Sequence, residues 1–245
     1  MAFMQKQFVL AITGASGMPY AARLLQVMLD AGHLVHVVPS RMGKAVWEQE
    51  LGLRLQPGWE IAFPPEWHVR PLEMFHEAAR HEKISCRENT PDQCVMNAEC
   101  GQGEPPEDSF PTGEMRLWEE NNLAAPIASG SYTTDAMVVC PCSCRTLGGI
   151  ASGAGEGLIF RAAEVHLKER RPLVIVPRET PISLIQIENM KRLARAGAFV
   201  LPPQPGFYQR PTTIGDLIDF VVARICDQIG IANNLSPRWG EPAEE

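Results

Sequence analysis

The sequence predicts an α/β protein with a parallel, doubly wound sheet, on three observations. Short apolar runs alternate with helical patterns along most of the 245 residues. These runs are continuous in hydrophobic residues, which is typical of parallel strands that are buried on both faces. The first run opens into a glycine turn and then a helical pattern, as at the start of a nucleotide-binding βα unit. Because strands that alternate with helices pair in parallel through crossovers, we expect helices on both faces of the sheet.

The N-terminal part carries the clearest pattern. A strand is expected at residues 8–13 (FVLAIT), followed by the glycine turn at 14–17 (GASG). Apolar residues at helical spacing then predict a helix at 19–31. A second strand is expected at 34–39 and a second helix at 44–51.

Regular patterns resume in the second half of the chain, where the run AMVVC predicts a buried parallel strand. Strands are expected at 136–140, 173–176 and 199–201. Helices are expected at 146–154, 158–169, 182–196 and 214–229. The chain is therefore expected to form a single domain over residues 1–245.

The segment between these two parts predicts an irregular acidic insertion, at about residues 57–121. It is rich in Pro, Glu and polar residues and weak in periodicity, although 68–83 can hold one helix. From Glu60 to Glu120 there are 14 acidic residues and five Lys or Arg residues. Since the whole chain has a net charge of −7, the remainder is mildly basic.

Composition excludes several functional classes. The negative net charge argues against bulk nucleic-acid binding, which favours a basic face. No stretch approaches the roughly 18–20 apolar residues that span a bilayer, and the N-terminus does not have the pattern of a signal peptide. Seven cysteines without such a signal suggest reduced thiols in a cytoplasm.

Two strand ends carry residues suited to binding a phosphate. In the turn at 14–17, glycines allow the backbone to approach a ligand, Ser16 adds a hydroxyl, and the following helix start offers N–H groups. An ordinary βα turn explains the same tetrapeptide equally well. At 141–146 (PCSCRT), Ser143 and Thr146 are placed to donate to a phosphate at the carboxyl end of a strand. Its two cysteines fit buried thiols better than a metal site, because C-x-C without a matching pair is a weak signal.

Charged side chains also lie at the ends of apolar runs, where core packing does not require them. Arg178 and Glu179 directly follow the strand LVIVP, which favours a ligand site over a surface ion pair. Arg161 and Lys168 are seven residues apart and therefore share one face of a helix. A solvated helix end remains the simpler explanation for Lys168, which belongs to the run KERR. Buried cations need partners, so we expect an anionic ligand.

Taken together, these segments resemble the UbiX-type flavin prenyltransferases, once described as aromatic-acid or phenylacrylic acid decarboxylases. The resemblance covers residues 7–56 and 123–240. It rests on TGASG, ASGS, PCS-x-x-T, RAA-x-V-x-LKERRPLV, PRETP, ENM, PGFY and DLIDFVVARI, in this order.

The resemblance implies a flavodoxin-like Rossmann three-layer sandwich, usually assembled as a dodecamer of trimers. It implies transfer of a dimethylallyl group from dimethylallyl phosphate or pyrophosphate to reduced FMN, at N5 and C6 of the flavin, without a metal. The product, prenylated FMN, would serve a UbiD-type decarboxylase.

Site residues follow from the resemblance by position. Those expected to bind FMN are Gly14, Ala15, Ser16, Ser40, Ser143, Cys144, Arg145, Thr146 and Arg178. Those expected to hold the donor and its phosphate are Glu50, Ser129, Arg161, Lys168, Tyr208 and Arg224. Lys and Arg would stabilise the charge that develops on the departing phosphate. The released phosphate would act as a base, Glu179 would relay a proton, and Tyr208 or Arg224 would complete a neighbouring subunit's site in a trimer.

The chain departs from the family pattern at three places. Leu123 stands where the family often has a Trp that lines the prenyl site, and Glu156-Gly157 stands where it often has an Asp-Asn or Asn-Asn pair. The insertion holds Cys86, Cys94 and Cys100, which fit either incidental thiols or a small metal site.

These departures leave other functions open. One is an FMN-binding carrier with an altered donor or no turnover. Another is a flavoprotein that decarboxylates cysteine-like substrates. That sister family depends on a catalytic His and a PASANT-type segment, whereas this chain has PCSCRT at the corresponding place and no His near it.

Overall fold

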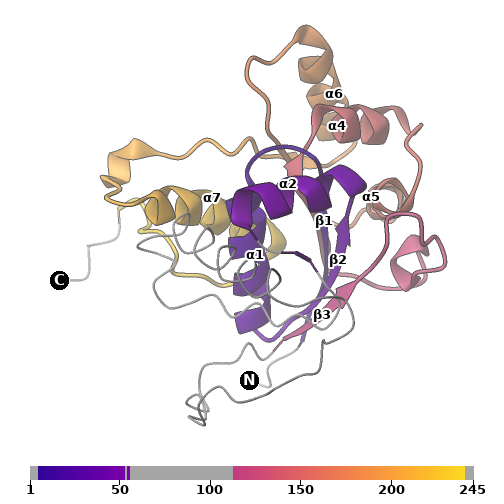
Figure 1. Cartoon of the computed structure of the whole chain (residues 1–245), viewed down its shortest axis with the longest axis horizontal. Helices are drawn as coiled ribbons and strands as arrows, with labels where there is room; N and C mark the ends of the chain where they lie inside the picture. The colour runs from indigo at the N-terminus through magenta and orange to yellow at the C-terminus, as the bar shows by residue number, and fades with distance from the viewer. Residues whose placement is uncertain (1–4, 53, 56–112, 241–245) are drawn as a thin grey trace, which may run out of the picture.

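A six-stranded parallel sheet organises the chain (Figure 1). The computed structural model describes residues 5–52, 54, 55 and 113–240. The strands are β1 (Gln7–Ile12), β2 (Leu34–Pro39), β3 (Glu114–Leu117), β4 (Ala136–Cys142), β5 (Leu173–Pro177) and β6 (Phe199–Val200). Their order is β3-β2-β1-β4-β5-β6, the Rossmann order. The chain reverses direction across the sheet between β1 and β4, and this is where ligands bind in such folds.

Helices cover both faces, which confirms the predicted three-layer sandwich. Six α-helices are described: α1 (Met18–Asp30), α2 (Arg41–Leu51), α4 (Cys144–Ser152), α5 (Leu158–Lys168), α6 (Leu184–Arg195) and α7 (Ile214–Ile229). Helices α1 and α7 pack together on one face, while α4 packs against α5 and α6 on the other. Two short 3₁₀ segments, η2 (Pro126–Ala128) and η3 (Phe207–Gln209), lie in connections. No described helix has both the length and the apolar character needed to cross a bilayer.

Alternation along β1 shows how the core divides into two. Phe8, Leu10 and Ile12 pack on the α1 side, and Val9 and Ala11 pack on the α5 side. Successive side chains of a strand point to opposite faces, and here both faces are covered, so the whole run is apolar. Truncating one of these buried side chains to Ala would cost about 2–5 kcal/mol of folding free energy.

The structure corrects the sequence prediction at β3. This strand lies inside the 57–121 segment that was expected to be irregular. It is a four-residue edge strand in which half-buried and exposed residues alternate, so it lacks the continuous apolar run of the other strands. The possible helix at 68–83 and the cysteines Cys86, Cys94 and Cys100 lie outside the described residues.

Two helices begin earlier than expected because a serine caps each of them. Ser40 accepts a hydrogen bond from the backbone N–H of Gly43, so α2 begins at residue 41 rather than 44. Ser143 accepts one from Thr146, so α4 begins at residue 144 rather than 146. Serine at this position satisfies an otherwise unpaired N–H of the first turn. Both serines therefore lie at helix starts on the carboxyl edge of the sheet.

Candidate functional site

The loops that follow β1 and β4 are fastened together at the carboxyl edge. The buried Thr13 hydroxyl donates to the carbonyl of Pro141 (2.8 Å) and accepts from the backbone N–H of Ser143 (2.7 Å). Thr13 precedes the turn at 14–17, and Ser143 begins α4. This connection fixes the two expected FMN-binding segments relative to each other, at the point where the sheet changes direction.

The start of α4 has the features of an anion site. The hydroxyls of Ser143 and Thr146 lie 3.0 Å apart, and the Ser143 cap orders the first turn. The first backbone N–H groups of a helix have no partners within it, and they carry the positive end of the helix dipole. Cys144 and Arg145 supply such groups through their backbones. The structure thus brings the predicted residues 143–146 into an arrangement that suits a phosphate.

The start of α1 is arranged differently. The Glu50 carboxylate accepts hydrogen bonds from the backbone N–H groups of Gly17 (3.0 Å) and Met18 (2.8 Å). These are the groups that the sequence suggested for a phosphate, and here an anionic side chain already uses them. The turn at 14–17 remains suited to close backbone approach. A Cβ on Gly14 would lie 2.5 Å from the Cβ of Met42, so the position requires glycine.

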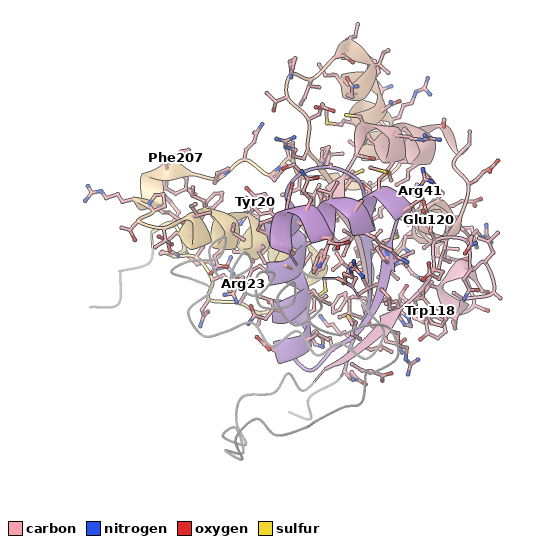
Figure 2. All side chains as sticks on the ribbon, in the orientation of Figure 1. Tyr20, Arg23, Arg41, Trp118, Glu120 and Phe207 are labelled. Carbon is pink, nitrogen blue, oxygen red and sulfur yellow. The ribbon has the colours of Figure 1, made fainter. Side chains whose placement is uncertain are left out.

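Tyr20 joins this edge and was missed by the sequence reasoning. Burial raises the pKa of its hydroxyl, the neighbouring Cys140 thiol adds to that increase, and Arg178 acts in the opposite direction. Tyr20 also lines a cavity of about 400 Å³ with Ser16 and Glu50. Figure 2 shows it near the start of α1, close to α2. A tyrosine in the first turn after a glycine turn was the available signal.

Glu179 is held by two donors immediately after β5. Its Oε1 accepts from the backbone N–H of Thr180 at 3.1 Å. Its Oε2 lies 3.6 Å from the Cys144 Sγ, which donates to it. Burial and the Glu179 carboxylate raise the pKa of this thiol. The pair lies beside Arg178, whose backbone N–H bonds the carbonyl of Cys142 at 3.2 Å.

A second group of predicted residues lies along α5. Arg161 donates to the carbonyl of Ala128 (2.9 Å) and to Glu164 (2.8 Å), and Lys168 pairs with Glu169. A Cβ on Gly130 would lie 2.6 Å from the Lys168 Nζ, so the ASGS segment runs beside the same helix face. Ser129, in this segment, bonds Ser131 through their hydroxyls at 2.9 Å. Arg161 and Lys168 therefore both lie beside the 128–131 segment, which contains Ser129.

Of the two α5 cations, Arg161 lines a cleft with Pro39 and Arg41 at the carboxyl end of β2, whereas Lys168 is not brought to the carboxyl edge within one chain. Lys168 ends α5 and comes shortly before the first residue of β5, whereas Arg178 directly follows its last residue. They lie at opposite ends of a five-residue strand, which is about 16 Å long at 3.3 Å per residue. The single site that the resemblance suggests is therefore divided in this chain.

A cleft of about 850 Å³ opens between the end of β2 and the start of α5. Arg161 and Leu123 line it, and the Leu123 side chain is 58% exposed. At the same wall, the carbonyl of Glu120 accepts from the backbone N–H of Leu158 at 2.6 Å. A Cβ on Gly157 would lie 2.9 Å from that carbonyl oxygen, and Gly157 has φ 95°. The structure thus explains glycine where the family often has an amide.

A backbone hydrogen bond and a partly buried chain of side-chain hydrogen bonds lie beside this cleft. Figure 2 shows Arg41 and Glu120 side by side, where the Arg41 backbone N–H donates to the carboxylate (2.9 Å). Two residues before Glu120, Trp118 donates through its Nε1 to the Nδ1 of buried His36 (2.9 Å). The His36 Nε2 lies 3.1 Å from the Tyr132 hydroxyl. The sequence did not indicate Trp118 as a residue of this cleft, because Trp118 lies in the 57–121 segment that is predicted to be irregular.

Tyr208 and Arg224 belong to η3 and α7, and α7 packs on the face of the sheet opposite α5. Tyr208, in η3, is exposed and packs edge-to-face on Phe220 and Trp239. Arg224, on α7, pairs with Asp227 at 2.8 Å. The helix that carries Arg224 is thus separated from α5 by the sheet in one chain, while its first turn borders the turn at 14–17 through Ile214 and Ile218.

Metal ligands are not gathered in the part of the chain that the structure describes. No group of three or more His, Cys, Asp or Glu side chains there is placed to hold a metal ion. The thiols of Cys140 and Cys142 are fully buried, which raises their pKa. Of the predicted C-x-C pair, Cys142 is therefore buried as expected, whereas the Cys144 thiol is only partly buried and donates to Glu179.

Comparison with known proteins extends these observations to the whole chain. A family model described as Flavoprotein matches residues 3–226. Flavin prenyltransferase UbiX from Pseudomonas aeruginosa is 40% identical over 236 residues, covering 96% of this chain and 95% of that protein.

Two solved structures share the fold and much of the sequence. AnUbiX in complex with FMN and dimethylallyl pyrophosphate has a TM-score of 0.69 and 31% identity, covering 98% of this chain and all of that one. A dodecameric FMN-dependent UbiX-like decarboxylase from Escherichia coli has a TM-score of 0.68 and 33% identity, covering 96% of this chain and all of the other. The chain belongs to the flavoprotein family and, within it, to the UbiX flavin prenyltransferases.

Proposed function

We propose that this protein is a flavin prenyltransferase that joins a dimethylallyl group to reduced FMN. The allylic C–O bond of dimethylallyl phosphate or pyrophosphate breaks, and the phosphate or pyrophosphate leaves with the bonding electrons. The flavin N5 bonds to the carbon released from the phosphate and loses its proton. A proton then adds to the remaining C=C bond, the carbon left positive bonds to C6 of the flavin, and C6 loses a proton. The observation that carries this proposal is the near-full-length likeness to a UbiX flavin prenyltransferase.

The carboxyl edge of the sheet fits FMN. The capped start of α4, with Ser143 and Thr146, offers hydroxyls and backbone N–H groups to the FMN phosphate. Arg178 has an exposed side chain directly beyond β5 that adds positive charge. The turn at 14–17 and Ser40 lie at the ends of β1 and β2, where backbone contacts to the flavin are available. Together these residues would bind the acceptor and fix its orientation.

The α5 surface fits the donor phosphate. Arg161 and Lys168 present two cations on one helix face, with Ser129 beside them. Cations placed where negative charge develops lower the barrier to leaving-group departure. The released phosphate, still held there, would accept the flavin proton, and Glu179 would relay it. Glu50, Tyr208 and Arg224 would complete the donor site.

The division of these residues supports a site built between subunits. In one chain Lys168 lies away from the carboxyl edge and α7 lies across the sheet from α5, and a symmetric assembly can bring such surfaces together. A UbiX-like structure from Escherichia coli is dodecameric. We therefore infer a dodecamer of trimers in which neighbouring chains supply the α5 and Tyr208–Arg224 groups to each FMN.

The product has a natural recipient and compartment in this proposal. Prenylated FMN would pass to a UbiD-type decarboxylase. The cysteines in the described part of the chain are free thiols, namely Cys140, Cys142, Cys144 and Cys226. Free thiols are typical of a reducing compartment such as the cytoplasm.

The test is the mass of the flavin product. The protein is incubated without oxygen with reduced FMN and either dimethylallyl phosphate or dimethylallyl pyrophosphate. We expect a flavin heavier by one five-carbon prenyl unit with one of the donors. FMN binding without a mass change with either donor would contradict the proposal and favour a flavin carrier.

A further inference from the structure

The contact between Cys144 and Glu179 joins two segments that are distant in sequence. Cys144 is the first residue of α4, and Glu179 follows β5 by two residues. The thiol donates to the Glu179 Oε2 at 3.6 Å, and the Thr180 backbone N–H donates to the Oε1 at 3.1 Å. Both carboxylate oxygens therefore have a donor, and only one of these donors is a side chain.

The thiol also has a neighbour on the other side. The Gln186 side chain, on α6, lies near the Cys144 thiol and acts to lower its pKa, against the larger effects of burial and of Glu179. The Oε1 of the same Gln186 accepts from the backbone N–H of Ser183 at 2.7 Å, within the capping box of α6. Cys144 thus lies between the start of α6 and Glu179. It ties the loop that carries Glu179 to the capped helix start that fits the phosphate.

We infer that Cys144 is a positioning residue that holds the Glu179 carboxylate at the cofactor edge for proton transfer. This inference rests on the proposed function, because it assigns Glu179 to the prenyl transfer reaction. The Cys144 backbone N–H belongs to the anion site, whereas its side chain serves Glu179. Substitution of the side chain therefore separates positioning of Glu179 from binding of FMN.

The geometry argues against other uses of this thiol. A nucleophilic cysteine needs surroundings that favour the thiolate, such as a nearby cation or a helix N-terminus. Although Cys144 begins α4, burial and the Glu179 carboxylate raise the pKa of its thiol and so disfavour the thiolate. Cys142, two residues away, is fully buried and is not available as a second metal ligand at the surface. Donation to Glu179 is the use that fits both neighbours.

Kinetics of three variants test the positioning role. Cys144→Ala should lower kcat about fivefold, as expected for loss of one net hydrogen bond. The donor KM and the FMN Kd should stay within about twofold, because the backbone site is retained. Cys144→Ser should restore kcat to within about twofold, since a hydroxyl can donate to the carboxylate. In a Glu179→Gln background, Cys144→Ala should change single-turnover rates by less than about twofold.

Two kinetic outcomes would overturn the inference. One is an equal loss of rate from Cys144→Ala with and without Glu179. The other is a loss of FMN affinity in place of kcat, which would make the side chain part of the cofactor site.

A spectroscopic measurement that needs no catalytic turnover tests the Cys144–Glu179 contact independently of the proposed function. The infrared S–H stretching band of Cys144, identified by its disappearance in Cys144→Ala, reports the acceptor of the thiol proton. In Glu179→Gln the band should move to higher frequency, because an amide oxygen accepts more weakly than a carboxylate. An unchanged band would show that the thiol does not donate to Glu179, whether or not the protein transfers a prenyl group.

Discussion

The carboxyl edge of the sheet and the α5 surface differ in how their functional groups are held. At the carboxyl edge, Thr13 fastens two loops, Ser143 caps a helix, and Glu179 has two donors. On α5, Arg161 and Lys168 each pair with a neighbouring glutamate within the same short stretch, at the surface. At the carboxyl edge, the long-range contacts join Thr13 to the 141–143 segment and Cys144 to Glu179, whereas of the two α5 cations Arg161 alone makes one, to the Ala128 carbonyl. The α5 surface carries cations whose functional partner the chain itself does not bring close.

This difference separates two kinds of site residue. Groups organised within the chain should govern stability and FMN binding. Groups presented on the surface should govern catalysis only in an assembly, since surface ion pairs contribute little to folding. The following predictions act on one region while leaving the other unchanged.

Loss of the Lys168 ammonium should have the largest effect. Lys168→Ala should lower kcat about 10²–10³-fold, because the departing phosphate loses a charge-stabilising donor. The FMN Kd and the free energy of unfolding should change little. Lys191→Ala is the matched control, since Lys191 is also an exposed lysine paired with a neighbouring glutamate, on α6. Equal rates for the two variants would remove Lys168 from the reaction.

Loss of the Thr13 hydroxyl should act on the opposite region. Thr13→Val leaves the backbone N–H of Ser143 without its acceptor, which should cost about 2 kcal/mol of unfolding free energy. FMN affinity should fall as well, because the start of α4 loses its connection to β1. Denaturant unfolding and flavin titration measure the two effects. Thr133→Val, at an exposed site, should change stability by under about 0.5 kcal/mol, and a Thr13 variant that matched it would refute the fastening role.

Acid should weaken the core that lies between the two regions. Burial lowers the pKa of His36, and also of His166, to about 4 from the ordinary 6.5. The unfolded chain therefore takes up protons first as the pH falls below 6.5. The free energy of unfolding should decrease by about 2 kcal/mol for each histidine between pH 6.5 and pH 5.

Denaturant titrations at a series of pH values measure this loss. A His36→Gln variant should lose the share of the slope that His36 contributes, while His166 and His33, whose pKa burial also lowers, still titrate. An identical slope in that variant would show that His36 does not contribute to acid sensitivity.

Substitution at the cleft wall should have the smallest effect. Leu123→Trp restores the aromatic residue that the family often has and, at an exposed position, should leave stability unchanged. The donor KM should fall by up to about threefold, because an aromatic face adds contact with the allyl group. Steady-state kinetics with the better donor measures it. A KM that rises would place Leu123 outside the donor site.

The sequence predicted the strands that are buried on both faces of the sheet, because these strands are continuous runs of apolar residues. Residues 8–13, 34–39 and 173–176 read as strands because both faces of the sheet are covered. β3 was missed because an edge strand with Glu114 and Arg116 exposed has no continuous apolar run. The early starts of α2 and α4 follow from their serine caps, a signal that Ser40 and Ser143 carried in the sequence.

The sequence indicated which residues belong to the candidate site better than it indicated which of them contact one another. Residues 143–146 and Arg178 lie at strand ends, so topology alone brings them to one edge. The sequence also indicated that Lys168 lies at the other edge of the sheet, because Lys168 precedes the strand at 173–176 and Arg178 follows it. Local sequence patterns cannot indicate contacts between segments that are far apart in the chain. Examples are the hydrogen bonds of Glu50 with the start of α1 and of Trp118 with His36.

Mixed assemblies test most directly the claim that the two regions meet only between chains. Arg178→Ala, which impairs the FMN region, and Lys168→Ala are each expected to be nearly inactive alone. The two are dissociated, mixed in equal amounts and reassembled, and mixing is verified by native mass spectrometry. Sites that take FMN groups from one chain and Lys168 from another should then regain about a quarter of wild-type activity. Activity no higher than the mean of the two variants, in verified mixed assemblies, would contradict the shared site.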